Sequence, residues 1–438
     1  MEVHALTTPD YDFVLASRHV TGRVMPGIRT APQVWLEELR ELGGGGGVLL
    51  TGSDAACEWL TTYRADVPAS LLSFETVGGA HVALMDKYRL HRIATAAGVR
   101  TPWTFEVTGR ARLAGLLDRL AYPCVLKPTL GHLAKELVGA GTVRIGSPAE
   151  LVGHGGRLLD HGLEFVVTEL VPGAETALEG AVVVRDRNGD YPLEYGRRKV
   201  RQFPLDYGVG SLTEAADVPE TVKICRRLLD WTGYVGVAAC ETKRHADTGE
   251  LYLIEVNVRL PGSFGMAQAC GIDGAWRLYA TLAGLPLGPQ REQVDGRKVL
   301  LPQKEVRAAY RRIRRGDASL REILASWRGT RDFGAIDLRD PRPALALAGR
   351  LAAKALGRTE RAGDVPDVVA DARPSGTGRR RVATRPGPVV PAALCEPAPA
   401  GAAARRRPIA PCVRERDDLP RERRARPDAE RRRTAASS

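Results

Sequence analysis

The chain has 438 residues, of which 44% are hydrophobic and 26% charged, and its formal net charge is +12. This length allows two or three domains with a sizeable buried core. There is no apolar stretch of about 18 residues and no charged and apolar leader, so the sequence predicts neither a membrane-spanning nor a secreted protein and favours a cytoplasmic enzyme. Widely spaced cysteines without CxxC or Cys/His clusters predict reduced, mostly buried thiols and argue against a zinc site: Cys57, Cys124, Cys225, Cys240, Cys270, Cys395 and Cys412.

Residues 1–85 predict a small α/β unit, with a strand near 1–6, a helix over 32–42 and a second strand over 48–54. The five consecutive glycines at 43–47 precede a strand instead of opening a helix, and no GK[ST] follows them. They therefore predict a flexible connector and not a phosphate-binding loop.

A helix is predicted over 86–98, because Asp86 can cap its first turn and Gly98 can end it. The apolar stretch 122–128 then predicts a short strand that carries Lys127. Lysine is scarce in this chain, with 9 Lys against 55 Arg, and a compact ammonium at a strand end suits a phosphate oxygen. Taken alone, Lys127 is better explained as a side chain that snorkels from a strand edge.

The following elements are strands over 141–145, 165–173 and 181–186. A helix is predicted over 217–233, with Asp217 as its N-cap. After residue 285 the pattern becomes helical and Arg-rich, and it fades near residue 357.

Residues 236–257 predict a β-hairpin with a tight turn. If its strands pair symmetrically about Thr248, Glu241 lies directly opposite Glu255. Facing carboxylates repel each other unless positive charge lies between them. Together with the amide oxygen of Asn257 they form an all-oxygen ligand set of the kind that Mg²⁺ prefers, so the hairpin predicts a metal site in which the metal keeps both carboxylates ionised.

The face of the second strand is the observation on which this site depends. Alternation places Leu251 and Leu253 on the same face as Glu255 and Asn257, so the polar pair continues an apolar stripe. An ordinary solvated strand face is the alternative, but such a face rarely begins with two leucines. A register slip of one residue would remove the site.

The order of these features resembles the ATP-grasp superfamily, and within it the carboxylate-amine ligases, over about residues 1–345. The matching features are the Asp-Lys helix start at 86–87, the V-L-K-P strand, the glycine-bearing loop 129–141, T-E-L-V-P-G at 168–173, a distant glutamate and I-E-V-N-V-R at 254–259. The resemblance implies an α/β (α+β) ATP-grasp fold, in which two α+β subdomains clamp ATP behind a small pre-ATP-grasp domain.

The implied domains follow one another along the chain. They are a partial N-terminal α/β pre-ATP-grasp domain over 1–85, a small subdomain over 86–165, a large subdomain with the metal site over 166–285, a helical extension over 286–357 and a disordered Arg/Pro/Ala-rich tail over 358–438. The N-terminal domain is expected to be incomplete, because the sequence starts at what would be its second strand.

The resemblance also implies a nucleotide site. Lys87 and Lys127 are similar to the two lysines of that family that contact the ATP phosphates. The hinge between subdomains, where backbone groups read adenine, corresponds to Glu169, Leu170 and Val171. Glu175 is similar to the acid that binds the ribose hydroxyls.

The remaining implied residues concern metal and phosphoryl transfer. Glu241, Glu255 and Asn257 are similar to the family's ligands for Mg²⁺ or Mn²⁺. Arg259 is similar to the arginine that stabilises charge on the transferred phosphoryl group. The implied reaction forms acyl phosphate and ADP from ATP and a small-molecule carboxylate, and an amine or similar nucleophile then attacks the acyl phosphate.

Two further stretches bear on this site. Lys199 and Arg201, in the basic segment 196–210, alternate onto one strand face and could hold the substrate carboxylate or the γ-phosphate; an exposed basic edge strand is an equal alternative. The loop 129–141 has fewer glycines than many relatives, so Lys135 or His132 could take over part of the phosphate contact.

The basic charge of the chain belongs to its end. Residues 373–438 hold 17 Arg, no Lys and 7 acidic residues, and no aromatic residue follows Phe333, so this tail is predicted to be disordered. An Arg-rich arm could bind nucleic acid or another acidic surface, but without interleaved aromatic residues nucleic acid is the less favoured partner. A biotin-carboxylase-like or bicarbonate-using enzyme is the other alternative, and the sequence does not define the oligomeric state.

Overall fold

The computed structural model describes residues 2–74, 80–129, 141–205 and 207–355. Most of the glycine-bearing loop, including Lys135 and His132, lies outside the described residues, and so does the predicted tail over 358–438. Within the described ranges, no helix combines the length and the apolar character that crossing a lipid bilayer requires.

The N-terminal part is built from short elements: β1 (His4–Thr7), η1 (Pro9–Ala16), β2 (Thr21–Val24), α1 (Pro32–Leu42), η2 (Gly43–Gly45), β3 (Gly47–Val48), α2 (Asp54–Tyr63), β4 (Leu71–Leu72) and α3 (Ala80–Met85). They include two parallel two-stranded sheets, β1–β2 and β3–β4. The predicted first strand and first helix are confirmed, the predicted second strand over 48–54 is only the short β3, and β2 and β4 were not predicted. The glycine run is a connector, as predicted, and Gly46 adopts a φ of 69°, which glycine tolerates best.

A four-stranded antiparallel sheet follows, in the order β5-β8-β6-β7. Its elements are α4 (Lys87–Ala96), β5 (Thr104–Val107), α5 (Arg110–Leu116), β6 (Cys124–Pro128), β7 (Val143–Ile145), α7 (Pro148–Asp160) and β8 (Phe165–Glu169). Leu116 of α5 and Leu158 of α7 pack on Leu126 and Val167, so these helices cover one face of the small sheet. The Asp86 cap of α4 is confirmed by its hydrogen bonds from the backbone N–H groups of residues 88 and 89.

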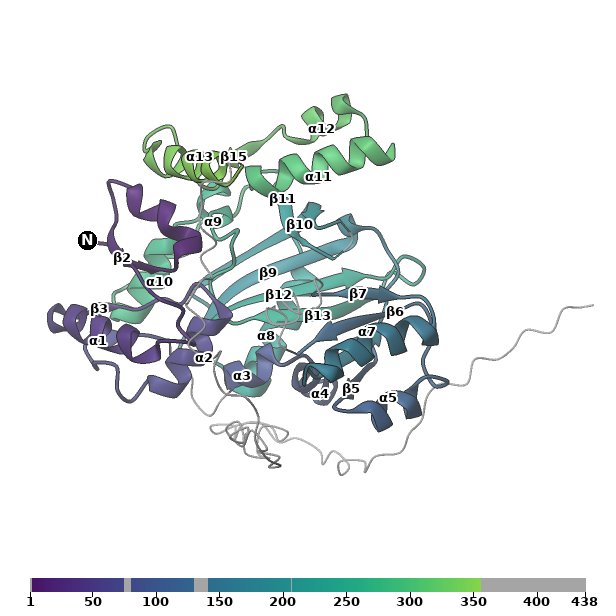
Figure 1. Ribbon diagram of the computed structural model, residues 1–438. Coiled ribbons are helices and arrows are strands. Elements are labelled where there is room, and N and C mark those ends of the chain that lie inside the picture. The colour runs from purple at the N-terminus through teal and green to yellow at the C-terminus, as the bar shows by residue number, and fades with distance from the viewer. Residues whose placement is uncertain (1, 75–79, 130–140, 206, 356–438) are drawn as a thin grey trace, which may run out of the picture.

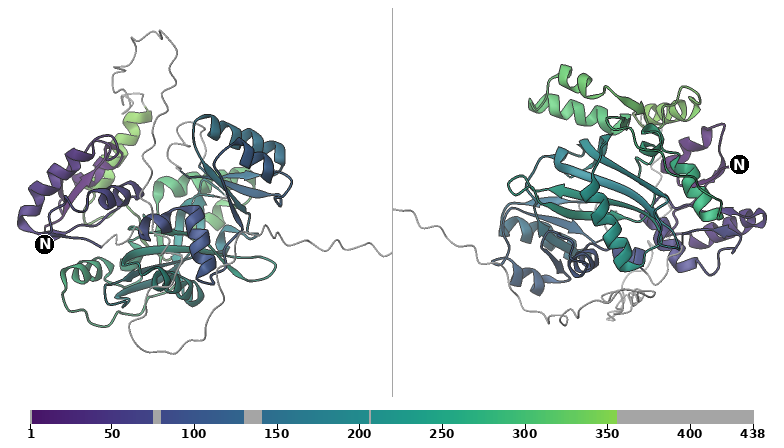
Figure 2. Two further views of the ribbon diagram at one scale, coloured as in Figure 1. Left: turned by 90° about the horizontal axis from the view of Figure 1, so that it is seen from below. Right: turned by 180° about the vertical axis from the view of Figure 1, so that it is seen from behind.

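The second sheet has seven strands, in the order β13-β12-β9-β10-β11-β14-β15. Its elements are η4 (Glu175–Ala177), β9 (Leu178–Arg185), β10 (Leu193–Phe203), β11 (Val209–Ala215), α8 (Pro219–Thr232), β12 (Gly236–Arg244), β13 (Leu251–Asn257), α9 (Met266–Ala269), α10 (Gly274–Ala283), β14 (Lys298–Leu300) and β15 (Thr330–Asp332). Figures 1 and 2 show the small sheet and its helices beside this large sheet.

Successive side chains of the large sheet point to opposite faces and pack in two separate hydrophobic cores. Ala238 and Cys240 pack with α8 on one face, whereas Val237 and Ala239 pack with α9 and α10 on the other. Helix α8 begins one residue later than predicted, with Val218 as its N-cap, so the prediction of Asp217 as the cap is wrong.

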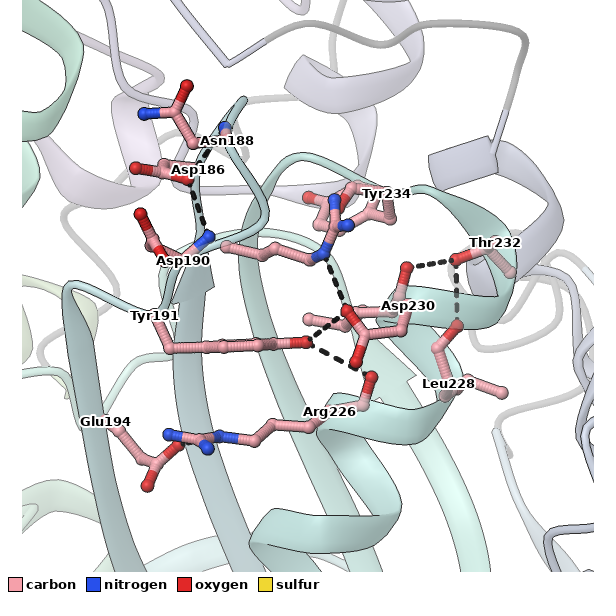
Figure 3. A network of polar contacts seen from close by, with 12 residues as sticks. Asp186, Asn188, Asp190, Tyr191, Glu194, Arg226, Leu228, Asp230, Thr232 and Tyr234 are labelled. Carbon is pink, nitrogen blue, oxygen red and sulfur yellow. Dashed lines mark hydrogen bonds and ion pairs between the residues drawn. The ribbon is translucent and has the colours of Figure 1, made fainter. Parts of the chain in front are cut away.

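Helix α8 is fastened to the β9–β10 hairpin by a network of polar contacts, drawn in Figure 3. The hydroxyl of Tyr191 donates to Asp230 Oδ1 at 2.9 Å, and Arg185 Nε donates to the same oxygen at 3.0 Å. Arg226 lies over the Tyr191 ring and donates to Glu194 Oε2 at 2.6 Å. Because these contacts hold α8 under the sheet, they also position the strands that carry the candidate site.

The cysteines among the described residues are free thiols and all are buried, as predicted: Cys57, Cys124, Cys225, Cys240 and Cys270. Burial raises the pKa of Cys124 and of Cys270 to about 11, so both are protonated at neutral pH. Cys395 and Cys412 lie outside the described residues.

The helical pattern predicted after residue 285 is confirmed by α11 (Pro302–Arg315), α12 (Leu320–Ser326) and α13 (Arg342–Ala355). Helix α13 returns to the N-terminal part, where Arg350 forms ion pairs with Asp10 and Asp12 of η1. Figure 2 shows these two segments side by side. The first and last described parts of the chain are therefore joined in one structure.

Candidate active site

The hairpin register predicted from the sequence is confirmed at the candidate metal site. Glu241 of β12 pairs with Glu255 of β13, and Ala239 pairs with Asn257. Closer to the turn the register is different, because Thr242 pairs with Leu253 and leaves Ile254 as an extra residue. The hairpin therefore contains a β-bulge beside the two glutamates.

The bulge reverses the alternation of side chains along β13. Leu253 packs in the same core as Val256 and Val258, on the α8 side of the sheet. The prediction that Leu253 shares a face with Glu255 and Asn257 is therefore wrong. The two polar residues lie on the opposite face from this core, and the bulge explains how a strand with a leucine stripe can present them.

Lys199 of β10 lies on the same face and contacts one of the glutamates. Its ammonium is 2.9 Å from Glu241 Oε1 and 2.8 Å from Glu241 Oε2, and both side chains are about nine-tenths buried. Strand β10 lies between β9 and β11, so the alternative of an exposed basic edge strand is wrong. Lys199 thus places a positive charge next to Glu241, one of the two paired carboxylates of the hairpin.

Two more lysines reach this place from the small sheet and its neighbouring helix. Lys127, near the end of β6, lies on the face opposite the α5 and α7 core, because Cys124 and Leu126 occupy the core face. Lys87 is the first residue of α4, directly after the Asp86 cap. The charges of Glu255, Lys87, Glu241 and Lys199 all influence the pKa of Lys127, and these five residues form what is called the lysine–carboxylate group below.

The pKa of Lys127 and the pKa of Glu255 are both lowered within this lysine–carboxylate group. Burial lowers the pKa of Lys127, Lys87 and Lys199 lower it further, and Glu255 and Glu241 partly offset them. The surrounding protein by itself would raise the pKa of Glu255, but Lys199, Lys127, Lys87 and a hydrogen bond from Asn257 outweigh this effect, and the pKa is lowered.

This balance bears on one expectation from the sequence. The metal was expected to be what lets the two facing glutamates stay ionised, whereas the lysines beside Glu255 lower its pKa and so favour its ionised form without a metal. With Lys87, Lys127 and Lys199 against Glu241 and Glu255, the group carries one more positive than negative charge when all five side chains are ionised. A polyphosphate is an anion of the kind that such a surplus attracts.

The donor set fits a magnesium ion that is shared with phosphates. Asn257 Nδ2 donates to Glu255 Oε1 at 3.0 Å, which orients the Asn257 amide oxygen as a further acceptor beside the carboxylate. Among the described residues there is no group of three or more His, Cys, Asp or Glu side chains that could hold a metal. Mg²⁺ in nucleotide sites needs only one or two carboxylates, because phosphates and water complete its octahedron.

The predicted hinge lies at the end of β8. The backbone N–H of Glu169 donates to the Trp103 carbonyl at 3.0 Å, and the Trp103 N–H donates to Glu169 Oε2 at 3.3 Å. Leu170 is partly buried and Val171 is buried, so this segment is held in place.

Glu175, the predicted ribose acid, has a partner that the sequence did not suggest. Its carboxylate forms an ion pair with Arg312 of α11. The helical extension therefore contacts the residue that was predicted to bind ribose. Arg312 is one of many arginines in α11, so the sequence contained no signal that set it apart.

Arg259 lies at the contact between the large sheet and the N-terminal part. Its Nε donates to Asp54 Oδ1 at 2.7 Å, at the first residue of α2, and Nη1 donates to the Leu260 carbonyl at 3.2 Å. Its side chain keeps 23% of its surface exposed. Arg259 follows Asn257 by two residues, just beyond the end of β13.

Arg201 does not lie with Lys199, which corrects its predicted place in the site. In the β10–β11 pairing, Lys199 lies opposite Thr213 and Arg201 opposite Leu212, so Val200 is an extra residue and the alternation reverses. Arg201 Nε donates to Glu305 Oε1 of α11 at 2.8 Å, and the two side chains are only 7% and 0% exposed. Arg201 therefore attaches α11 to the sheet instead of facing the candidate site.

The buried Arg201–Glu305 pair makes a prediction about stability. Replacing Arg201 with methionine should lower the free energy of unfolding by about 3–5 kcal/mol, because Glu305 then stays buried without its cation. The double variant Arg201→Met/Glu305→Leu should recover most of this loss. Arg198→Met is the control, because the Arg198–Glu214 pair is half exposed on its arginine side and should contribute less than about 1 kcal/mol. Urea unfolding measures all three, and an Arg201→Met variant as stable as the control would contradict the assignment.

The four-stranded sheet beside the seven-stranded sheet has the arrangement of the ATP-grasp fold, as predicted from the sequence. No protein-family model matches the sequence, and no curated protein matches it significantly. Solved structures do resemble the fold.

Three of these structures are enzymes, and two of the three contain a bound nucleotide. The carboxyaminoimidazole ribonucleotide synthase from Aspergillus clavatus, complexed with ATP, has a TM-score of 0.52 and 16% identity over 72% of this chain and 80% of that chain. The N5-carboxyaminoimidazole ribonucleotide synthetase from Thermus thermophilus has a TM-score of 0.51 and 18% identity over 68% of this chain and 75% of that one. The biotin carboxylase domain of Hydrogenobacter thermophilus 2-oxoglutarate carboxylase, in complex with MgADP, ADP and bicarbonate, has a TM-score of 0.50 and 16% identity over 68% and 67%.

Proposed function

We propose that the protein is an ATP- and Mg²⁺-dependent ligase that activates a carboxylate as an acyl phosphate for attack by an amine or a similar nucleophile. The observation that carries this proposal is the lysine–carboxylate group, in which Lys199 contacts Glu241 and the charges of Lys199, Lys127 and Lys87 lower the pKa of Glu255. The ATP-grasp fold and its nucleotide-bound relatives support the same conclusion.

The proposed nucleotide contacts divide between the two sheets. Lys87 and Lys127 bind phosphate oxygens, since the charges of both lysines influence the pKa of Glu255 in the large sheet. Backbone groups of residues 169–171 read the adenine edge, and Glu175 accepts from the ribose hydroxyls. Because Glu175 is paired with Arg312, nucleotide binding must share or replace this ion pair.

Glu241, Glu255 and Asn257 would hold the magnesium ion. When bound, Mg²⁺ offsets charge on the phosphates and so favours phosphoryl transfer. Lys199 now neutralises Glu241 and is within reach of any phosphate that approaches this carboxylate. It is therefore the lysine whose partner is expected to change between the free and the nucleotide-bound protein.

The proposed reaction has two steps. A carboxylate oxygen of the substrate attacks the γ-phosphorus, the bond from that phosphorus to the bridging oxygen breaks, and ADP leaves with this oxygen. The amine then attacks the acyl carbon, releases inorganic phosphate and gives up a proton to form an amide. We assign to Arg259, just beyond Asn257, the role of binding the negatively charged oxygens that develop in both steps.

A bicarbonate-using reaction is the second candidate. It is favoured by one observation, the similarity to a biotin carboxylase domain whose structure contains bicarbonate and MgADP. In that case bicarbonate takes the place of the carboxylate, and carboxyphosphate replaces the acyl phosphate.

A coupled assay for ADP release tests both candidates. Purified full-length protein is incubated with Mg-ATP and a matrix of carboxylates, bicarbonate included, and amines. The proposal predicts that ADP release rises with one carboxylate class and that product formation requires an amine. If bicarbonate is the one compound of the matrix that stimulates ADP release, the second candidate is favoured. If neither a carboxylate nor bicarbonate stimulates ADP release, both candidates are contradicted.

A further inference from the structure

The face of the large sheet that carries Glu241 and Glu255 also carries an arginine. Gly180 of β9 pairs with Glu241 of β12 on one side and with Arg197 of β10 on the other. Because residues paired directly across a sheet have their side chains on the same face, Arg197 lies in one row with Glu241 and Glu255. Lys199 follows Arg197 by two residues and lies on the same face. Arg197 is thus a further cation beside the lysine–carboxylate group.

Gly180 leaves the middle of this row without a side chain. A Cβ atom at position 180 would lie 3.2 Å from Arg197 Nε and 3.4 Å from Arg197 Cγ, so the arginine side chain leans over the glycine. Glu241 and Lys199 line the same small hollow as Arg197. Its volume is about 10 Å³, which suffices for about one water molecule or one oxygen atom of a larger ligand. The hollow can therefore receive an oxygen of a reactant, but not the reactant as a whole.

Arg197 has no carboxylate partner within the described ranges. Its neighbour Arg198 forms an ion pair with Glu214 at 2.8 Å, whereas Arg197 Nη1 donates to the hydroxyl oxygen of Ser263 at 2.5 Å. Arg197 Nε is buried and has no hydrogen-bond partner in the described part of the chain. A partly buried charge without an opposite charge is unfavourable in the free protein. An anion bound beside Arg197 would supply the missing negative charge.

Thr213 leads to the same conclusion. It lies opposite Lys199 in the β10–β11 pairing, lines the hollow and is 2% exposed. Its hydroxyl has no hydrogen-bond partner among the described residues. Buried hydroxyl groups are rarely left unpaired, and this one borders two cations. The hollow therefore combines donors that suit an anionic oxygen.

We infer that Arg197 binds an anionic oxygen of a reactant, which belongs either to the substrate carboxylate or to the terminal phosphate of ATP. The inference rests on the proposed function and adds a binding residue to that same site. Both sources present oxygens that the planar guanidinium group matches. Because Glu241, a proposed metal ligand, lies only two strands away, an oxygen bound by Arg197 lies beside the proposed place of phosphoryl transfer.

Ser263 is the residue that positions Arg197. It is 6% exposed and belongs to the segment after β13 that also contains Arg259. This segment runs from the edge strand β13 to the Arg197 side chain on β10, although β12 and β9 lie between the two strands. The position of the Arg197 guanidinium therefore depends on the same segment as that of Arg259.

Replacement of Arg197 with glutamine in the full-length protein tests the inference. Calorimetry measures the affinities for Mg-ATP and Mg-ADP, and ADP release is measured against the concentration of the carboxylate that stimulates it most. If Arg197 binds the substrate carboxylate, the KM for this carboxylate should rise about tenfold or more, while both nucleotide affinities stay the same. If Arg197 binds the terminal phosphate, the preference for Mg-ATP over Mg-ADP should fall about tenfold or more. An unchanged KM together with an unchanged nucleotide preference would overturn the inference.

Arg198→Gln is the matched control, because Arg198 is the next residue of β10 and its side chain pairs with Glu214 on the opposite face. It should change neither the KM nor the nucleotide preference. Ser263→Ala should shift the same quantity as Arg197→Gln by a smaller factor, and Ser263→Thr, which keeps the hydroxyl, should restore it.

Urea unfolding of the same proteins separates binding from a structural role. Arg197→Gln should not lower the stability of the free protein, because no ion pair of the described part is lost. A clear loss of stability with an unchanged KM and an unchanged nucleotide preference would show that Arg197 is purely structural, and it would overturn the inference.

The wild type distinguishes this inference from the proposed function. If no carboxylate stimulates its ADP release, the proposed function fails, and the preference for Mg-ATP over Mg-ADP alone decides the inference. If the wild type is stimulated and Arg197→Gln equals it in both measurements, the proposed function stands and the inference fails.

Discussion

Replacement of Glu255 with glutamine is expected to reduce carboxylate-dependent ADP release by at least about a hundredfold, because it removes a proposed ligand of the ion that stabilises charge during phosphoryl transfer. The same variant should be less stable than the wild type in the absence of Mg-ATP. Lys199, Lys127 and Lys87 lower the pKa of Glu255, so its ionised form stabilises the folded protein. Because the Glu255 side chain is exposed, this loss should be less than about 1 kcal/mol.

The sign of this effect can be checked by pH. A carboxyl group whose pKa is lowered on folding contributes stability above its unfolded pKa of 4.5, and the contribution is lost as the pH falls through the lower folded value. The stability difference between wild type and Glu255→Gln should therefore be present at neutral pH and shrink below about pH 4.5. Glu250→Gln, in the same hairpin but paired with Arg100 on the surface, is the matched control for activity. Full activity and full Mg-ATP-dependent stabilisation in Glu255→Gln would contradict the metal-ligand role.

Replacement of Lys127 with methionine should have the opposite effect on stability and a similarly large effect on nucleotide binding. The variant should bind ATP at least about tenfold more weakly, because a phosphate partner is lost. The free protein should become more stable at neutral pH, since burial and the neighbouring lysines lower the pKa of Lys127 and its charged form is therefore disfavoured in the folded state.

The pH dependence of this gain follows from the direction of the shift. An amine whose pKa is lowered on folding costs stability below the folded pKa, and the cost disappears as the pH rises towards the unfolded value of 10.5. The advantage of Lys127→Met should therefore shrink in alkaline solution. Lys223→Met, on the exposed side of α8, is the control and should change neither property. Calorimetry with ATP and urea unfolding at several pH values provide the measurements, and unchanged ATP affinity would remove Lys127 from the site.

The sequence was sufficient to predict the pairing of Glu241 with Glu255, but for a reason that was only partly right. The prediction assumed one symmetric register about Thr248, whereas the pairs next to the turn are offset by one residue. The bulge at Ile254 restores the predicted register at the glutamates. A single sequence shows the turn residues and the polar pair, but it does not show where a strand takes up an extra residue.

Arg201 shows the same limit with a different outcome. Simple alternation placed it beside Lys199, and the bulge at Val200 turns it to the other face. Its partner Glu305 is more than a hundred residues away in a helix whose other charged residues are mostly exposed. Local periodicity contains no information on such a long-range pair, so only the fold reveals that Arg201 is buried and paired.

The lysines of the candidate site could be predicted more reliably. Lys87 follows a helix cap, Lys127 stands near the end of an apolar strand, and Lys199 lies within the long strand β10, so each lies in a regular element that the sequence indicates. Their meeting point depends on how the small sheet packs beside the large one. The family resemblance supplied that arrangement, and the fold confirms it.

The most direct test of the central claim is a crystal structure of the full-length protein with Mn²⁺ and a non-hydrolysable ATP analogue, measured with anomalous scattering at the manganese edge. The proposed function predicts a manganese peak within coordination distance of Glu255 and Asn257, with Lys127 on the phosphates and adenine at residues 169–171. A nucleotide bound elsewhere, or a manganese ion that contacts none of Glu241, Glu255 and Asn257, would contradict it.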